Sequence, residues 1–156
     1  MTPITIRQAT ETDMETLLRF EQGVIAAETP FDCTLKTGPT YFYNIPEMIA
    51  ATHIELLVAE TDKQLIASGY ARIENAKHYV QHTHHAYLGF MYVVPEYRGQ
   101  GINKKIIEAL QQWSLSKNIT EFRLDVLEGN LPAIKAYEKI GFAKHLIEMR
   151  MGLEKK

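Results

Sequence analysis

Residues 86–103 read AYLGFMYVVPEYRGQGIN, and this stretch decides the fold. Its nearly continuous apolar run from Ala86 to Val94 predicts a central strand that is buried on both faces. Pro95 ends that strand, and Gly99 and Gly101 then turn the chain. The sequence therefore predicts a buried strand that leads into a glycine-rich turn.

A helix is predicted to follow the turn. Apolar residues recur at spacings of four, four and three from Ile102 to Trp113, which indicates an amphipathic helix. Phe122 to Val126 then alternates apolar and polar residues, as a strand does. Strand, helix and strand over residues 86–127 predict a right-handed parallel crossover. Pro132 and Gly141 sit where a further helix begins and ends.

The remaining segments complete a mixed sheet. The predictions are a strand at Ile4–Gln8, a helix opened by a capping box at Thr12–Glu15, an irregular or briefly helical segment at Thr29–Pro46, strands at His53–Glu60 and Gln64–Glu74, and a last strand at Phe142–Leu153. Gly69 predicts a bulge or a close backbone contact inside its strand. The expected class is α/β (α+β), with a mixed, mostly antiparallel central sheet flanked by helices, and residues 1–156 are expected to form one domain.

Composition excludes several classes of protein. The chain has 156 residues and a formal charge of -2, so it lacks the basic balance expected of a nucleic-acid-binding protein. Its longest apolar run, about Ala86 to Val94, is far shorter than the ~20 residues of a membrane helix. The single cysteine, Cys33, has no partner for an internal disulfide, and Thr5 and Arg7 make the N-terminus too polar for a signal peptide. We therefore expect a cytoplasmic protein with no membrane and no nucleic-acid partner.

The loop from Arg98 to Asn103 has the chemistry of an anion site. Two glycines allow close approach of a ligand, and the start of a helix presents free N–H groups with a favourable dipole. Ile102 and Asn103 stand where a P-loop needs Lys and Ser or Thr, and Lys104 stands where a dinucleotide fingerprint needs its third glycine. Taken alone, the loop is equally compatible with a basic surface turn.

A second motif, at the last predicted helix, accompanies the loop. Asn130, Ala133, Tyr137 and the pair Gly141-Phe142 match the spacing Asn-x-x-Ala-x-x-x-Tyr-x-x-x-Gly-Phe. Together with the loop pattern Gln/Arg-x-x-Gly-x-Gly/Ala, matched through Arg98, this order of motifs resembles the GNAT superfamily of N-acetyltransferases. The resemblance is strong over residues 86–142 and implies a GNAT-like acyl-CoA N-acyltransferase fold that uses acetyl-CoA as co-substrate.

The resemblance also implies residue roles. The backbone of Tyr92, Val93 and Val94 would pair with the pantetheine arm and polarise the thioester carbonyl. The pyrophosphate would be held by the loop residues Arg98, Gly99, Gln100, Gly101, Ile102 and Asn103. Asn130 would contact pantetheine, although Asn is also a preferred helix cap. Tyr137 would protonate the departing thiolate as general acid, although a core aromatic residue is the alternative at that position.

Two positions depart from the family pattern. Asn103 stands where Gly or Ala is usual in the loop. Many relatives carry a catalytic Glu or Asp on the central strand, and the corresponding residue here is about Gly89, in a run without any carboxylate. The general base is therefore unassigned. Its candidates are Glu74, Tyr92, His84 and His85.

The acceptor is expected to bind at the irregular segment, where relatives build their acceptor pocket. Asp32 would attract a cationic amine, and Tyr41, Phe42 and Tyr43 would form a wall, unless these aromatics only pack the segment onto the core. Four histidines, His78, His82, His84 and His85, lie on and after a polar loop without the cysteines or paired carboxylates of a metal site, so no metal is expected.

The predicted reaction is direct attack of a primary amine of a small molecule or peptide on acetyl-CoA in a ternary complex. The alternative is a non-catalytic CoA-binding or regulatory domain, which the missing carboxylate near Gly89 keeps open. A homodimer is also expected, because a single final strand would leave an apolar sheet edge exposed.

Overall fold

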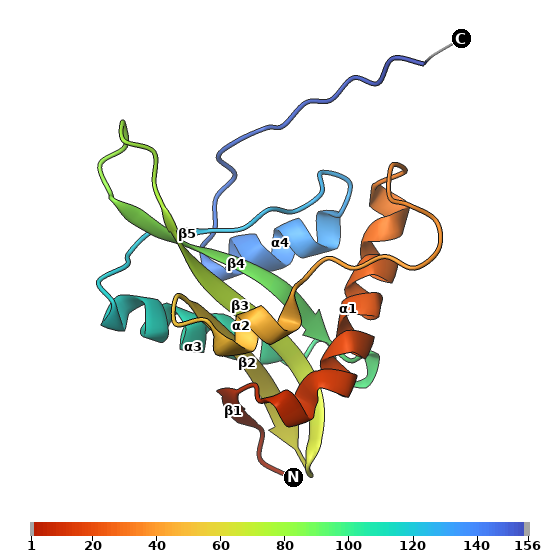
Figure 1. Cartoon of the computed structure of the whole chain (residues 1–156), viewed down its shortest axis with the longest axis vertical. Helices are drawn as coiled ribbons and strands as arrows, with labels where there is room; N and C mark the ends of the chain where they lie inside the picture. Colours follow the sequence, from red (N-terminus) through yellow and green to blue (C-terminus); the bar gives the residue numbers. More distant parts are fainter. Residues whose placement is uncertain (1, 155–156) are drawn as a thin grey trace.

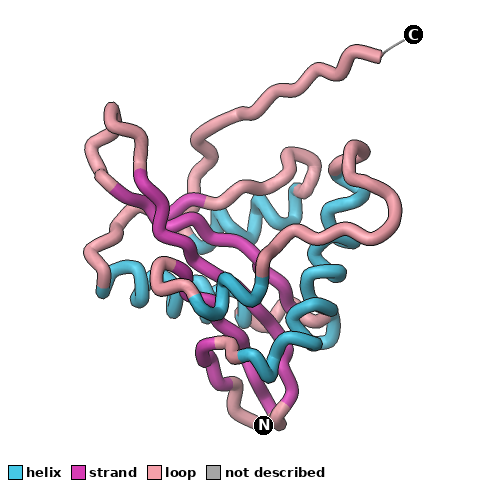
Figure 2. The backbone as a smooth tube through the Cα atoms, in the orientation of Figure 1, coloured by secondary structure: helices cyan, strands magenta, loops and turns pink. Residues whose placement is uncertain are grey.

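The computed structural model describes residues 2–154 and contains one mixed sheet with helices on both faces (Figures 1 and 2). The elements in chain order are β1 (Thr5–Gln8), η1 (Glu11–Asp13), α1 (Met14–Glu28), η2 (Thr29–Phe31), α2 (Ile45–Ala50), β2 (Ile54–Thr61), β3 (Gln64–Asn75), β4 (His84–Val93), η3 (Pro95–Tyr97), α3 (Ile102–Ser116), β5 (Phe122–Arg123) and α4 (Leu131–Ile140). The predicted class is confirmed, and the internal strands and the helices α1, α3 and α4 lie within a few residues of their expected places. α2 begins at the end of the segment expected to be irregular or briefly helical and continues beyond it.

The sheet has the order β1-β2-β3-β4-β5, and only β4 and β5 run parallel. The predicted parallel crossover through α3 is thus confirmed. β3 occupies the middle of the sheet, while β4 lies between it and the short β5. Ala86, Leu88 and Phe90 of β4 are each at most 1% exposed, as its apolar run predicts. β2 and β3 are joined by Asp62 and Lys63, both in the left-handed region that a tight hairpin turn requires.

Two hydrophobic layers cover the sheet. On one face Leu17 and Phe20 of α1 and Met48 of α2 pack on Leu56 and Tyr70 of the sheet. The opposite face is covered by α3, through a row of buried side chains that includes Ile102, Ile106, Ile107 and Leu110. Tyr137 of α4 joins this second layer. The alternation of side chains along the strands therefore buries both faces of the sheet.

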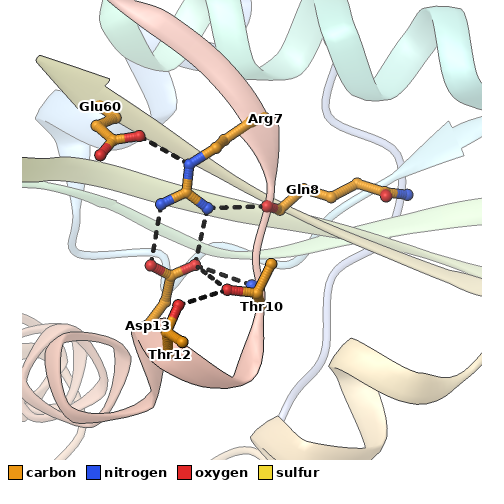
Figure 3. Close-up of polar contacts among 6 residues, drawn as sticks. All are labelled: Arg7, Gln8, Thr10, Thr12, Asp13 and Glu60. Carbon is orange, nitrogen blue, oxygen red and sulfur yellow. Dashed lines mark hydrogen bonds and ion pairs between the residues drawn. The ribbon is translucent and has the colours of Figure 1, made fainter. Parts of the chain in front are cut away.

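The entry to α1 differs from the predicted capping box at Thr12–Glu15. A 3-10 turn precedes the helix, and the backbone N–H of Thr10 donates to the Asp13 carboxylate over 2.8 Å. Asp13 is held there by the Arg7 guanidinium, with N···O distances of 2.9 and 3.0 Å, and Arg7 also bonds Glu60 (Figure 3). The capping box is therefore formed by Thr10 and Asp13, and the tertiary fork to Arg7 holds its carboxylate in place.

Replacing Arg7 with Ala is expected to lower the free energy of unfolding by about 2 kcal/mol at neutral pH, because it leaves the buried Asp13 carboxylate without its cation. Hydrogen bonds from Arg7 hold the pKa of Asp13 below its ordinary value of 3.8. The stabilisation that Asp13 contributes is complete when the pH lies above the ordinary pKa of the carboxyl group. It is lost as the pH falls from that pKa towards the lower pKa of the folded state. Urea denaturation at pH 7 and pH 3 measures both effects. The exposed Arg19→Ala variant is the control, and an equal loss in both variants would contradict the prediction.

The predicted last strand at Phe142–Leu153 is wrong. Residues 142–154 form an extended tail that leaves α4 and runs away from the sheet (Figure 1). β5 spans only two residues, so it offers a very short ladder for a following strand to pair with. Arg150 ties the tail to the segment after α1, through the Thr34 hydroxyl at 2.9 Å and the Asp32 carboxylate at 3.3 Å. Across residues 2–154, no helix combines the length and the apolarity needed to cross a bilayer.

Candidate active site

A bulge distorts β4 at the centre of the site. Ser68 pairs with Tyr92 and Tyr70 pairs with Gly89, so a single β3 residue lies opposite Phe90 and Met91. Phe90 has a φ of 52°, and its carbonyl accepts a hydrogen bond from the Ser68 hydroxyl over 2.9 Å. Such bulges bend a strand and redirect its backbone groups. This one re-aims the end of β4.

β4 also separates from β5. The two strands pair only at Ala86–Phe122 and Tyr87–Arg123, so the edge of β4 beyond Tyr87 has no β5 ladder beside it. The N–H groups along this open edge are available to an extended ligand that lies where a strand would lie. β4 therefore splays away from its parallel neighbour after Tyr87.

The orientation of the β4 backbone refines the predicted contacts. Val94 donates its N–H to the Ile66 carbonyl of β3 and accepts a hydrogen bond from the Tyr97 N–H, so its backbone is already engaged. Because successive residues of a strand point to opposite edges, Met91 and Val93 present their N–H groups to the open edge. Met91 was missed by sequence reasoning, and Val94 lacks the free N–H expected of it. The position of the bulge decides which residues of β4 direct their N–H groups to the open edge, and the sequence does not reveal that position.

The glycine loop leads from β4 to α3 as predicted. Gly99 and Gly101 both have a φ of 78°, and no heavy atom lies within 4 Å of an added Cβ at either position. Ile102 begins α3, whose first-turn N–H groups have no helical partner. The half-buried Asn103 carries an Oδ1 atom without a hydrogen-bond partner. The geometry is that of an anion site at a helix N-terminus.

Arg98 belongs to the strand end as much as to the loop. Its Nε donates to the Val93 carbonyl over 2.9 Å, and its guanidinium lies 5.7 Å from the centre of the Tyr92 ring. Tyr92 in turn contacts Phe20 of α1, with ring centres 4.8 Å apart. Arg98 therefore fixes the turn between β4 and the loop.

α4 carries the second motif. The Asn130 side chain accepts the Ala133 N–H over 3.4 Å, so Asn130 caps the helix as the alternative interpretation predicted. The half-buried Tyr137 packs edge-on to Phe142, with ring centres 6.0 Å apart. Burial raises the pKa of the Tyr137 hydroxyl, and the charge of Glu28 raises it further. The phenol consequently keeps its proton throughout the neutral range.

The four predicted acceptor residues are not all brought together. The ring of Tyr43 stacks on Phe90 at the bulge, with centres 4.5 Å apart, while Phe42 packs against the core. Tyr41 is 71% exposed. Asp32 lies after η2, where Arg150 and Thr34 bond its carboxylate and lower its pKa. Tyr43 is the one of the four that reaches the bulge of β4.

A buried carboxylate that sequence reasoning missed holds Tyr43 in place. Glu21 of α1 is fully buried, and its Oε2 accepts the backbone N–H groups of Phe42 and Tyr43 over 2.9 and 2.7 Å. These bonds anchor the segment between α1 and α2 to the helix. An acidic residue within the amphipathic pattern of α1 gives no signal of such a role.

The candidate bases occupy other environments. Glu74 is bonded to Arg72 and to the Nε2 of His85, at 2.6 and 3.1 Å in the two ion pairs. His84 is exposed at the start of β4 and bonds Thr83. The ring of Tyr92 packs against α1, as described above.

Gly89, the position of the acid in many relatives, has no room for a side chain. A Cβ there would lie 2.6 Å from the Tyr70 ring. Contacts that tight force a neighbour to move, so the Tyr70 ring and a carboxylate at this position exclude each other. β4 therefore carries no carboxylate at the position where many relatives have one.

The four histidines of the predicted loop have separate partners. His82 lies 3.3 Å from Glu121, and His78 packs edge-on to Tyr79. Within residues 2–154 no group of three His, Cys, Asp or Glu side chains is arranged to hold a metal ion.

Known proteins resemble this chain in sequence and in fold. The chain is 47% identical over 62 residues to thialysine N-epsilon-acetyltransferase of Sus scrofa. The aligned region covers 40% of this chain and 36% of the pig protein. It is 27% identical over 99 residues to aminoglycoside N(6')-acetyltransferase type 1 of Salmonella typhimurium, covering 62% and 67% of the two chains. A predicted acetyltransferase with acetyl-CoA from Clostridium acetobutylicum superimposes with a TM-score of 0.71 at 19% identity, over 96% of each chain.

The match to the pig enzyme spans about a third of that protein, so it does not transfer a substrate. The family match is broader. The profile described as the acetyltransferase (GNAT) family matches residues 24–142, which include the bulged strand, the glycine loop and α4. The chain belongs to the acetyltransferase (GNAT) family.

Proposed function

We propose that the protein transfers the acetyl group of acetyl-CoA to a primary amine of a small molecule or peptide, by direct attack in a ternary complex. The observation that carries this proposal is the unpaired edge of β4 beside its bulge, which ends at the N-terminus of α3. An extended pantetheine arm fits the open edge, and the first-turn amides of α3 suit its pyrophosphate.

The residue roles follow from the same geometry. Met91 and Val93 donate their open-edge N–H groups to the thioester and the pantetheine, and the Met91 amide next to the bulge stabilises the developing oxyanion. Gly99 to Asn103 provide the backbone amides for the pyrophosphate. Tyr137 gives its proton to the departing thiolate.

The test is release of CoA from acetyl-CoA in the presence of a panel of primary amines. Two relatives are named as acetyltransferases of thialysine and of aminoglycosides, so the panel should contain both types of amine. We expect CoA release that depends on the amine and saturates with it. A non-catalytic CoA-binding domain is the second candidate, favoured by the absence of an acid at Gly89. It predicts tight binding of acetyl-CoA without turnover of any amine.

We also propose that the tail pairs with a second copy to form a homodimer. Five of its apolar side chains are between 84% and 88% exposed: Leu146, Ile147, Met149, Met151 and Leu153. The outer edge of β5 is unpaired in the described sheet. Exposed apolar strands and open edges favour association.

Light scattering at micromolar concentration tests the assembly. We expect the mass of a dimer, and of a monomer after removal of the residues from Leu146 onward. A monomeric parent protein would remove the proposal.

The cytoplasm is the compartment that we propose, because Cys33 is a free, exposed thiol and such thiols suit a reducing environment. Cell fractionation tests this assignment, and recovery of the protein from an oxidising compartment would contradict it.

A further inference from the structure

Glu28, the last residue of α1, carries a half-buried carboxylate that nothing in the described chain neutralises. Within residues 2–154 its side chain makes no ion pair and accepts no hydrogen bond. Burial raises the pKa of this carboxyl, and the charge of Asp32 raises it further. A negative charge at a helix C-terminus is also disfavoured by the helix dipole. The position is costly for a residue with a structural role only.

The face of α1 that carries Glu28 is the face that meets the reaction centre. Glu28 follows Glu21 by two helical turns, so both project from the same side of the helix. Glu21 binds the backbone of Tyr43, whose ring stacks on Phe90 at the bulge. One residue before Glu21, Phe20 contacts the ring of Tyr92 on β4. Glu28 therefore continues a row of residues that line β4 and the acceptor segment.

The end of α1 also meets the start of α4. Phe31 of η2 lies 3.2 Å from the point where a Cβ on Gly129 would stand, and Gly129 directly precedes the cap of α4. Figure 1 shows the upper end of α1 beside the N-terminal end of α4. This contact brings the end of α1 next to the start of α4.

The titratable groups around Glu28 come from each of these elements. Its charge raises the pKa of Tyr43, from the acceptor segment, and of Tyr137, from α4. Asp32 follows η2, close after Glu28 in the chain, and Arg150 of the tail forms an ion pair with Asp32. Glu28 thus lies within electrostatic reach of the proposed general acid.

The other carboxylates near the site are already paired. Glu74 bonds Arg72 and His85, and Asp125 accepts a hydrogen bond from the Tyr87 hydroxyl over 3.2 Å. Both oxygens of Glu74 are bonded, whereas Asp125 keeps Oδ1 unbonded but is exposed to solvent. Glu21 also keeps one oxygen, Oε1, without a partner, but its side chain is fully buried. Glu28 is half-buried and makes no ion pair or hydrogen bond within residues 2–154, so it can exchange a proton with solvent.

We propose that Glu28 is the catalytic base that accepts a proton from the acceptor's ammonium group. The inference rests on the proposed acetyltransferase function. The neutral amine then forms the C–N bond as the C–S bond breaks, and Tyr137 gives its proton to the thiolate sulfur. The second proton lost by nitrogen restores the Tyr137 hydroxyl, and Glu28 passes the first to solvent. The products are the N-acetyl amine, CoA as its thiol, and one proton.

Glu28→Gln tests this role in the full-length protein. The variant and its parent are compared on two acceptors, an amine that is protonated at neutral pH, as lysine side chains of pKa about 10 are, and a fluorinated analogue that arrives neutral. We expect kcat to fall about 100-fold on the protonated amine. On the neutral analogue the variant should keep most of the parent's rate. The exposed Glu15→Gln on the same helix is the matched control.

The outcomes separate the two proposals. If the parent turns over neither amine, the acetyltransferase function itself fails. If the parent is active and Glu28→Gln matches it on both amines, Glu28 is not the base. An equal loss on both amines, at every pH, would also overturn the inference, since it would mark a structural role. Support requires a selective loss that shrinks as pH rises toward the pKa of the amine, with acetyl-CoA affinity unchanged.

Discussion

Tyr137→Phe is expected to lower kcat about 100-fold while leaving acetyl-CoA affinity within about threefold, because it removes only the proton that the thiolate needs. The half-buried ring keeps its edge-on contact with Phe142 after the change. Burial and the charge of Glu28 raise the pKa of the hydroxyl, so the parent holds this proton across the neutral range. Steady-state kinetics and acetyl-CoA titration measure the two quantities separately.

The exposed Tyr79→Phe provides the control for loss of a phenol in itself. If Tyr137→Phe retained the kcat of the parent, another group would protonate the thiolate and Tyr137 would return to the role of a packing residue. A parallel loss of acetyl-CoA affinity would instead identify its hydroxyl as a binding group.

Gly101→Val is expected to weaken acetyl-CoA binding at least tenfold. Gly101 has a φ of 78°, where a side chain costs about 1–2 kcal/mol and a β-branched one is especially unfavourable. An added Cβ has no heavy atom within 4 Å, so the effect arises from backbone strain and not from a clash. The strain moves the first-turn amides of α3 away from the pyrophosphate. Calorimetric titration with acetyl-CoA measures the change.

Asn103→Gly is the matched comparison in the same loop. It restores a residue usual in the family and should keep acetyl-CoA affinity within about an order of magnitude. If Gly101→Val bound acetyl-CoA as the parent does, the loop would not hold the pyrophosphate. A collapse of affinity in Asn103→Gly would show that the Asn103 side chain is itself a ligand.

The sequence predicted the strand, turn and helix on the proposed donor side because consecutive residues specify each of them. An apolar run, a proline and two glycines specify strand, turn and helix locally, and the structure places Gly99 and Gly101 at the expected positive φ. The register beyond the bulge is different. Whether Met91 or Val94 presents its N–H to the open edge depends on one unpaired residue of β4, which no periodicity encodes.

The acceptor side was less predictable because it depends on tertiary contacts. Glu28 is a polar residue at the end of an amphipathic helix, and only the packing of Phe31 near Gly129 brings it beside α4. Glu21 is buried because it binds two backbone amides far along the chain. The tail was predicted as a strand from its apolar residues, but a strand needs a paired edge as well as a pattern.

The central claim is that this chain acetylates an amine directly from acetyl-CoA at the bulge of β4. An initial-velocity matrix, with acetyl-CoA varied against the best amine of the panel, tests it most directly. We predict that CoA is released only when both substrates are bound together. Double-reciprocal plots of initial velocity should then intersect. Saturable acetyl-CoA binding with no amine-dependent release of CoA would contradict it, as would parallel plots that report an acetylated enzyme intermediate.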